Sequence, residues 1–381
     1  MKPVYFDHGS SSVPKAPGVA AAVSDYLNTA AYNVGRGAYA ASFDLAMEVL
    51  QTRELLARYF NAQSPREVIF TPGLTHAINT ILSGFLVEGD HVITSSMEHN
   101  AVMRPLYALH KERGLRYDVV DCDANGLLKP DDIVPLITGD TKALVLSHAS
   151  NVCGTVQPLH EIAEICAKHK IRLIVDAAQT AGHLPLDASL CDALAFPGHK
   201  GLLGPTGIGG FIIKNDFASE VKASIWGGTG SLSQGFDQPD FLPDKFESGT
   251  MNIAGILGLK ASLEYLLKQE DGVAYQHEMA LYSRLAAGLR KIEEIEIVAD
   301  GSTKVPVLSL NFPKHDNAAI AAQLDKDFDI MTRCGLHCAP AAHKTLGTFP
   351  QGTLRISLGQ SNTIEEVDYL IASLKELLHG I

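Results

Sequence analysis

Residues 171–179 read IRLIVDAAQ, and residues 192–201 read DALAFPGHKG. Each stretch opens with a short apolar run that is typical of a buried strand. Asp176 and Gln179 follow the first run, and Lys200 follows the second run at a glycine-rich turn. A lysine at a tight turn, together with an aspartate at a strand end, is the pair that pyridoxal phosphate requires. The amine bonds to the aldehyde, and the carboxylate keeps the pyridine nitrogen protonated so that the ring accepts electrons.

The rest of the first two thirds of the chain alternates between short apolar strands and helical patterns. The expected strands cover residues 67–71, 91–95, 115–120, 142–147, 171–175, 192–196 and 209–213. The expected helices cover residues 75–87, 99–112 and 160–169, with a weak helix between the strands that end at 120 and begin at 142. This alternation predicts an α/β fold with a parallel sheet and helices on both faces. Ligands of such sheets bind at the carboxyl ends of the strands.

The pattern changes after about residue 250. Long helices are expected at 253–267 and 272–292, short strands at 296–298, 305–312 and 354–358, and a last helix at 364–379. We therefore expect a large domain formed by residues 15–255 and a smaller α+β domain formed by residues 1–14 and 256–381.

Composition and charge argue against several classes of protein. The net charge is −12 and no basic stripe is visible, which disfavours nucleic acid as a partner. No apolar run approaches the ~20 residues that a membrane-spanning helix needs. The amino terminus lacks the apolar core of a signal peptide, and the six cysteines are scattered apart from Cys334 and Cys338. We expect a cytoplasmic protein with reduced thiols and no membrane span.

Three further segments follow strands and carry candidate binding residues. Residues 71–76 join a strand to a helix, so the amides of Leu74 and Thr75 would form an anion site, although Thr75 is equally suited to be a helix cap. His99 is placed to lie flat on a planar cofactor and to handle protons, or simply to cap a helix. Asn151 would contact the substrate or the ring oxygen, or would only stabilise a turn.

Cys338 is the second candidate for chemistry. It lies beside His337 and near Arg333, where a thiol would be held as the nucleophilic thiolate. A buried inert cysteine and a zinc site formed by Cys334, His337 and Cys338 are the alternatives, but no second cluster completes a tetrahedral set.

Arg355 lies inside an apolar strand and therefore needs an anionic partner. A substrate carboxylate would provide that partner, and a structural salt bridge is the alternative.

Taken together, these motifs resemble the class V aminotransferase group of fold-type I pyridoxal-phosphate enzymes. Within this group the chain is similar to the cysteine desulfurases and selenocysteine lyases, in particular to the second type of cysteine desulfurase. The resemblance covers nearly the whole chain, and its specific parts are Asp176 with Gln179, His199 with Lys200, and the segment 333–340. It implies a large domain with a mainly parallel seven-stranded sheet and a smaller α+β domain.

The resemblance also implies a role for each matching residue. Lys200 would bond to pyridoxal 5'-phosphate and shuttle protons, Asp176 would bind the pyridine nitrogen, Gln179 the phenolic oxygen, and His99 would stack on the ring. Leu74, Thr75 and His199 would bind the phosphate, and Thr250 would bind the phosphate of the neighbouring subunit of a homodimer. Arg355, Asn151 and Arg36 would bind the substrate. Cys338 would attack the substrate sulfur.

The chain departs from the family pattern in three places. Pro197 replaces a serine that usually contacts the phosphate, residues 7–10 read DHGS in place of Asp-Asn-Ala-Ala, and Leu336 replaces a histidine two residues before Cys338. The role of Cys334 is open.

The expected activity is conversion of L-cysteine to L-alanine with transfer of sulfur to Cys338 and then to an acceptor protein. The alternatives are a selenocysteine lyase, another lyase or aminotransferase of the group, and a non-catalytic sulfur-relay or scaffold protein.

Overall fold

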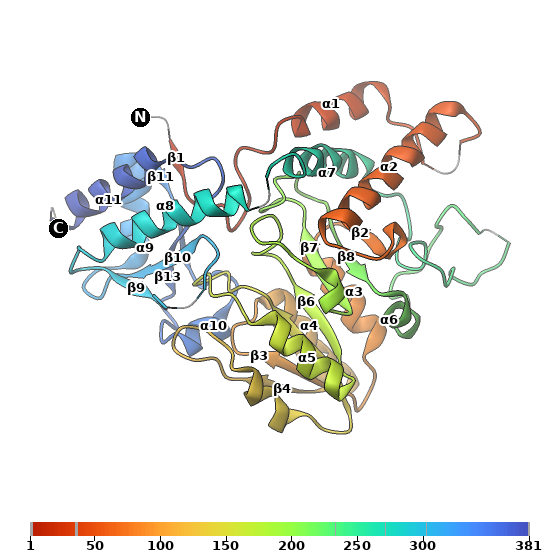
Figure 1. The fold of residues 1–381 in the computed structure, drawn as a ribbon, viewed down its shortest axis with the longest axis horizontal. Helices are drawn as coiled ribbons and strands as arrows, with labels where there is room; N and C mark the ends of the chain where they lie inside the picture. The colour runs from red at the N-terminus through yellow and green to blue at the C-terminus, as the bar shows by residue number, and fades with distance from the viewer. Residues whose placement is uncertain (1–2, 35–36, 233, 271, 302, 380–381) are drawn as a thin grey trace.

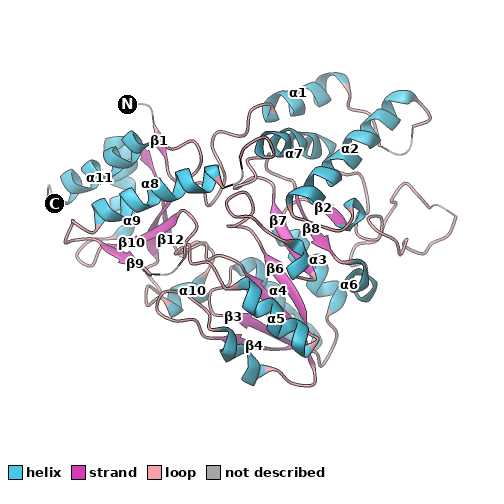
Figure 2. Ribbon diagram, in the orientation of Figure 1, coloured by secondary structure: helices cyan, strands magenta, loops and turns pink. Residues whose placement is uncertain are grey.

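The computed structural model of the chain describes residues 3–34, 37–232, 234–270, 272–301 and 303–379. Its centre is a seven-stranded sheet with the strand order β2-β8-β7-β6-β5-β3-β4 (Figures 1 and 2). The strands are β2 (Val68–Thr71), β3 (His91–Ser95), β4 (Arg116–Val120), β5 (Thr141–Ser147), β6 (Arg172–Asp176), β7 (Ala193–Pro197) and β8 (Gly209–Ile213). Only β8 runs antiparallel to its neighbours, so the prediction of a mainly parallel seven-stranded sheet is confirmed.

Helices cover both faces of this sheet because successive side chains of a strand point to opposite faces. In β6, Leu173 and Val175 pack in one core and Ile174 packs in another. The helices of the first face are α1 (Val19–Thr29), α2 (Ala40–Tyr59), α5 (Leu159–His169) and α7 (Ile253–Leu266), and those of the second are α3 (Leu74–Phe85), α4 (Asn100–Arg113) and α6 (Asn215–Glu220). Strands β2, β3, β7 and β8 are therefore buried along their whole length, whereas the edge strand β4 keeps Arg116, Asp118 and Val119 exposed.

The weak helix predicted between β4 and β5 is a 3₁₀ segment, η2 (Pro130–Leu136). Pro130 opens this segment, and Pro135 lies inside it without the backbone N–H that the interior of an α-helix needs. Two shorter 3₁₀ segments, η1 (Pro65–Glu67) and η3 (Ala188–Leu190), connect other elements.

The carboxyl-terminal part forms a second layer structure around a four-stranded antiparallel sheet of order β12-β13-β10-β9 (Figure 2). Its strands are β9 (Glu296–Val298), β10 (Val307–Asn311), β12 (Arg333–Gly335) and β13 (Thr353–Ser357). The helices of this part are α8 (Val273–Leu289), α9 (Asn317–Phe328), α10 (Pro340–Thr345) and α11 (Ile364–His379). A separate pair joins β1 (Val4–Tyr5) to β11 (Ile330–Met331) in parallel.

The packing bears on the domain boundaries, which stay a prediction. Val4 and Phe6 belong to the same core as α8, α9 and α11, which favours placing the first residues with the smaller domain. Ile256, Leu259 and Leu263 of α7, however, belong to the core of the larger sheet. We therefore favour a boundary after Leu266 over one at residue 255.

Among the described residues, no helix is both long and apolar enough to cross a membrane.

Candidate active site

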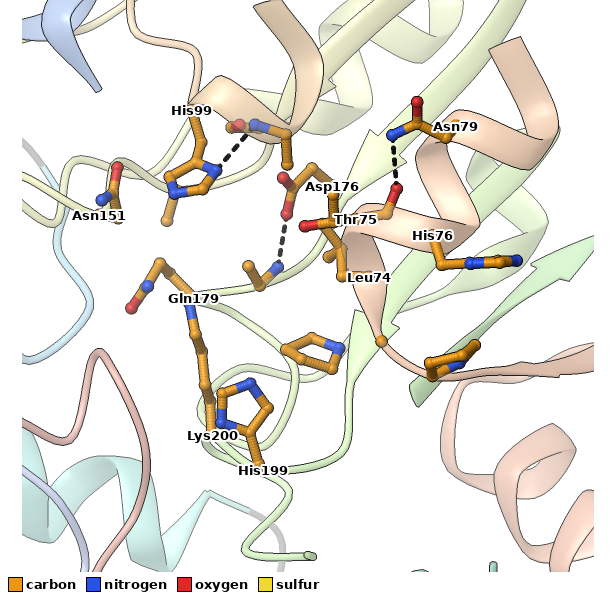
Figure 3. A pocket seen from close by; sticks show the side chains of 17 residues that line it. Leu74, Thr75, His76, Asn79, His99, Asn151, Asp176, Gln179, His199 and Lys200 are labelled. Carbon is orange, nitrogen blue, oxygen red and sulfur yellow. Dashed lines mark hydrogen bonds between the residues drawn. The ribbon is translucent and has the colours of Figure 1, made fainter. Parts of the chain in front are cut away.

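A cavity of about 620 Å³ lies at the edge of the large sheet where its parallel strands end (Figure 3). The segments that follow β2, β3, β5, β6 and β7 all contribute to its wall. The strand order reverses next to β3, because β4 lies on one side of it and β5 on the other. Crevices at such reversals are the usual binding sites of open α/β sheets. Nine residues that the sequence singles out line this cavity: Leu74, Thr75, His99, Asn151, Asp176, Gln179, Pro197, His199 and Lys200.

Lys200 and Asp176 point into the same space (Figure 3). Burial lowers the pKa of Lys200 to about 8, although the negative charge of Asp176 opposes this shift. Burial likewise raises the pKa of Asp176 to about 6, against the backbone N–H of Ala178, which donates to its Oδ1 at 2.8 Å. At neutral pH the aspartate is therefore mostly ionised, and a substantial fraction of the lysine is neutral near pH 8.

His99 caps α4 and also lines the cavity. Its Nδ1 accepts a hydrogen bond from the backbone N–H of Ala101 at 3.0 Å, which leaves the proton of the neutral ring on Nε2. Burial, followed by the positive charge of Lys200, lowers the pKa of His99 to about 4. Gln179 is buried, and its amide nitrogen donates to the backbone oxygen of Gly9 at 3.0 Å.

Glu98, the residue before His99, is a structural element of the site that we did not predict. It is fully buried and accepts hydrogen bonds from the hydroxyls of Ser95 and Ser147, both at 2.6 Å, and from the backbone N–H of Ser147 at 3.0 Å. Burial raises the pKa of Glu98 to about 7. Because Ser95 ends β3 and Ser147 ends β5, this carboxyl group ties together the two strand ends that precede His99 and Asn151.

The amino terminus of α3 forms one end of the cavity. Leu74 and Thr75 open this helix, and the first amides of a helix have no partner within it. His199 lies nearby, and its Nδ1 is buried without a hydrogen-bond partner among the described residues. Burial and the charge of Lys200 lower the pKa of His199 to about 4. Pro197 faces the cavity in the place where the family has a hydroxyl, and so adds no hydrogen bond there.

Arg355 lies on β13 and is 1% exposed. Its Nη2 donates to Asp7 Oδ1 at 2.6 Å and to Ser10 Oγ at 2.9 Å, and its Nη1 donates to the backbone oxygen of Asn151 at 3.0 Å. The Nε atom has no partner among the described residues. Asp7 is thus the anionic partner that Arg355 was expected to need. The salt bridge with Asp7 uses Nη2 and leaves Nε without a partner among the described residues.

Cys338 is exposed on a turn that the fold holds in an unusual conformation. His337 and Cys338 have φ angles of 48° and 58°, in the left-handed region that residues with a side chain rarely adopt. Two hydrogen bonds fasten this turn: Asn151 Nδ2 donates to the oxygen of His337 at 2.6 Å, and the N–H of Asn100 donates to the oxygen of Cys338 at 2.8 Å. Both donors belong to segments that also line the cavity or adjoin His99, so the thiol is fixed beside the site.

Arg333 is the charged neighbour of this thiol. Its Nη2 lies 3.8 Å from Cys338 Sγ, and its Nη1 donates to Ser10 Oγ at 2.7 Å. Cys334 is the next residue of β12, so its side chain points to the opposite face of the strand. His337 turns inward and its Nε2 contacts Thr353, which separates it from the thiol. Among the described residues, no three histidine, cysteine or acidic side chains are placed to hold a metal ion.

Among the described residues, three predicted site residues do not line this cavity: Cys338, Arg355 and Thr250. Arg355 and the turn of Cys338 are joined to it by hydrogen bonds with Asn151. Thr250 is exposed. Arg36 lies outside the described residues.

Comparison with known proteins gives a consistent picture. The sequence model of the family described as aminotransferase class-V matches residues 4–370. A probable cysteine desulfurase of Methanothermobacter thermautotrophicus is 35% identical, with 98% of this chain and 94% of the relative covered. One from Borreliella burgdorferi is 33% identical, with 98% of this chain and 92% of the relative covered.

Solved structures agree with these relatives. The apo structure of a cysteine desulfurase from Thermococcus onnurineus superposes with a TM-score of 0.93 at 30% identity, covering 100% of this chain and 96% of the other. A cysteine desulfurase of Escherichia coli gives a TM-score of 0.90 at 29% identity, covering 100% and 95%. The chain therefore belongs to the aminotransferase class-V family and to the group of cysteine desulfurases within it.

Proposed function

We propose that this protein is a pyridoxal 5'-phosphate-dependent cysteine desulfurase that moves sulfur from L-cysteine to Cys338 and releases L-alanine. The observation that carries this proposal is the turn that holds Cys338. An exposed thiol sits on an anchored left-handed turn beside Arg333, and Asn151 both lines the cavity and binds that turn. A merely structural cysteine would need neither the exposure nor the strain.

The residues of the cavity fit pyridoxal phosphate. The free amides at the start of α3 and the unpartnered Nδ1 of His199 suit a phosphate, and the buried carboxylate of Asp176 suits a protonated ring nitrogen. When bound, the cofactor supplies an aldehyde for the amine of Lys200 and a ring that withdraws electrons from the substrate Cα. We assign the ring oxygen to Gln179, the stacking contact to His99 and the phosphate to Leu74, Thr75 and His199.

Each remaining side chain then has one task. The amine of Lys200, whose pKa is about 8, removes the proton from the substrate Cα and later returns one. The guanidinium of Arg355 holds the substrate carboxylate, and its free Nε supplies a donor beyond those used by Asp7. Asn151, and Arg36 by its place in the family pattern, would assist in binding the substrate.

Cys338 accepts the sulfur in a step that balances. The Cβ–S bond of L-cysteine breaks, and an S–S bond forms with Cys338 Sγ, so the substrate sulfur leaves as the outer atom of a persulfide. The carbon gains the electron pair and a proton, and the product is L-alanine. An exposed persulfide can then pass its outer sulfur to the thiol of an acceptor protein.

The test compares Cys338→Ala with the unchanged protein on L-cysteine and L-selenocysteine. We expect the variant to keep the visible absorbance of the bound cofactor and to lose alanine formation from cysteine, and we expect the unchanged protein to gain 32 Da on the Cys338 peptide. Alanine from selenocysteine alone would identify a selenocysteine lyase. Pyruvate with ammonia, or a keto acid, would identify another lyase or an aminotransferase, and full cysteine activity of the variant would exclude the persulfide role.

We further propose a homodimer with shared sites. The segment between α6 and α7 projects from the body of the molecule in Figure 1 and carries Trp226, which is 74% exposed, and α2 carries Phe43, which is 64% exposed. Large exposed apolar side chains of this kind mark association surfaces. Thr250 lies at the end of the same segment and would reach the phosphate of the partner. Light scattering at micromolar concentration tests this, and a monomer would contradict it.

The six cysteines are all free, which supports the proposal of a reducing compartment such as the cytoplasm. Fractionation of cells that express the protein tests this location.

A further inference from the structure

The turn that carries Lys200 rests on the ring of His183. A Cβ atom added at Gly201 would lie 2.8 Å from both Cδ2 and Nε2 of His183, and 2.4 Å from the backbone oxygen of Ala181. No side chain therefore fits between Gly201 and the imidazole. The residue next to Lys200 is packed directly on His183, whose side chain is 11% exposed.

His183 is held by a buried carboxylate from the other part of the chain. Its Nδ1 lies 2.8 Å from Oε2 of Glu278 on α8, whose side chain is 1% exposed. Leu281 and Leu285 of the same helix belong to the carboxyl-terminal core. The second oxygen, Glu278 Oε1, has no partner among the described residues, so within this part of the chain the imidazole is the hydrogen-bond partner of a buried carboxylate. The pair thus joins the carboxyl-terminal core to the turn of Lys200.

The charges around the pair favour a protonated His183. Burial lowers the pKa of His183 and so does the charge of Lys200, but Glu278 outweighs both and the pKa is raised above 6.5. The other titratable groups that face the pair are His8 and Tyr275. Burial, and then the charge of His183, lowers the pKa of His8 to about 4, and burial, followed by the charge of Glu278, raises the pKa of Tyr275, so neither is charged at neutral pH.

We propose that His183 is a positioning residue for Lys200: clamped by Glu278, it supports the turn and keeps a positive charge near the amine. This inference rests on the proposed role of Lys200. Burial, and then the charges of Arg355 and Arg333, lower the pKa of Lys200, against the charges of Asp176 and Asp7. The repulsion between His183 and Lys200 acts in the same direction as the two arginines and favours the neutral, reactive amine. A purely structural pair would support the turn but would leave the titration of the amine unchanged.

The test neutralises the clamp with Glu278→Gln and uses Asp368→Asn as a matched control. Asp368 of α11 pairs at 2.6 Å with Arg284, which lies on α8 like Glu278, but the side chains of Asp368 and Arg284 are both about half exposed. In full-length protein without cofactor, the pH midpoint for acetylation of Lys200 by acetic anhydride is measured by peptide mass spectrometry. The release of pyridoxal phosphate from the loaded protein is followed by absorbance.

In Glu278→Gln the imidazole loses its proton and the repulsion disappears. We expect the midpoint of Lys200 to rise by at least half a pH unit and cofactor release to accelerate several-fold. Asp368→Asn should match the unchanged protein, and Glu278→Asp, which keeps the charge, should restore most of the difference. An unshifted or lowered midpoint in a folded Glu278→Gln protein, or an equal shift in the control, overturns the proposal.

Two further measurements separate the possible failures. If Glu278→Gln does not fold, His183→Gln must raise the midpoint in the same direction, and the nitrogen NMR shifts of His183 in the unchanged protein must show a protonated ring at pH 7. Protection of Lys200 by pyridoxal phosphate in the unchanged protein tests the proposed function itself. Loss of that protection would refute the function, whereas intact protection with no effect of Glu278→Gln would refute only the role of His183.

Discussion

Replacing Asp7 by asparagine should separate the two roles considered for Arg355. The guanidinium is 1% exposed and Asp7 is its ion-pair partner, at 2.6 Å. Asparagine keeps the shape and one acceptor oxygen but removes the charge. If Arg355 only forms a structural salt bridge, the variant loses stability and its affinity for the substrate does not increase. If Arg355 also receives the substrate carboxylate, Asp7 competes with the substrate, and removing its charge should favour binding.

The structure sets the size of the stability loss. Removing one partner of a buried ion pair typically costs about 3–5 kcal/mol, because the other charge stays buried without compensation. Asp7 is 20% exposed, and Ser10 Oγ and the oxygen of Asn151 still accept hydrogen bonds from Arg355. We therefore expect a loss below this range, about 2–3 kcal/mol. In the control Asp140→Asn, both members of the ion pair with Arg116 are more than half exposed, and we expect a loss below about 0.5 kcal/mol.

Urea unfolding of both variants measures the loss, and steady-state kinetics with L-cysteine measures the binding. We expect Asp7→Asn to unfold at lower urea with an unchanged slope and to show a KM several-fold lower than that of the unchanged protein. The companion variant Arg355→Lys, which cannot make the two-pronged contact, should raise KM at least tenfold. A KM that rises in Asp7→Asn would show that Arg355 is structural and that the substrate carboxylate binds elsewhere.

Three further predictions follow from the site. Asn151→Ala removes the 2.6 Å bond to the turn of Cys338, so sulfur transfer should fall about tenfold while the cofactor stays bound; undiminished transfer would show that the turn needs no such anchor. Cys334→Ala should leave single-turnover persulfide formation intact, because this side chain faces away from Arg333, and a loss would show that Cys334 assists the transfer. Burial lowers the pKa of Lys200 to about 8 and so favours its neutral form in the folded protein. The unfolded chain binds this proton at a higher pH, and the free energy of unfolding therefore falls as pH drops from 10.5 toward 8. The rate of cofactor uptake should accordingly rise through a midpoint near pH 8, and a midpoint near 10.5 would contradict the burial effect.

Local signals made most of the fold predictable. The bounds of β3, β8, β9 and α11 agree with the predicted ranges, because each is a run of one periodicity between clear breaks. The long helix α2 was not predicted, although Leu45, Val49, Thr52 and Leu56 are buried at helical spacing. Apolar and small residues at this spacing predict a helix with one buried face. The sequence carries no such signal for the pairing of β1 with β11, because the two strands have two residues each and lie more than 320 residues apart.

The candidate site divides in the same way. Residues at strand ends, such as Asp176, His99 and Lys200, were predictable because parallel strands bring their carboxyl ends to one edge whatever the loops do. Contacts between residues that lie far apart in the sequence were not predictable. An arginine in an apolar strand announces that it needs an anion, but nothing in the neighbourhood of Arg355 identifies Asp7, which lies 348 residues away.

The network around Ser10 shows what this long-range pairing achieves. The hydroxyl donates to Asp7 and accepts from both Arg333 and Arg355, so one small side chain links the arginine beside the thiol to the arginine proposed for the substrate. The family pattern has alanine at this position, and alanine makes none of these bonds. If Arg355 turns toward a substrate carboxylate, Asp7 and Ser10 lose a donor and Arg333 becomes their remaining cation. Binding of the substrate would in this way draw on the same hydrogen bonds that hold Arg333 beside Cys338, which couples the two ends of the reaction through residues that no local motif predicts.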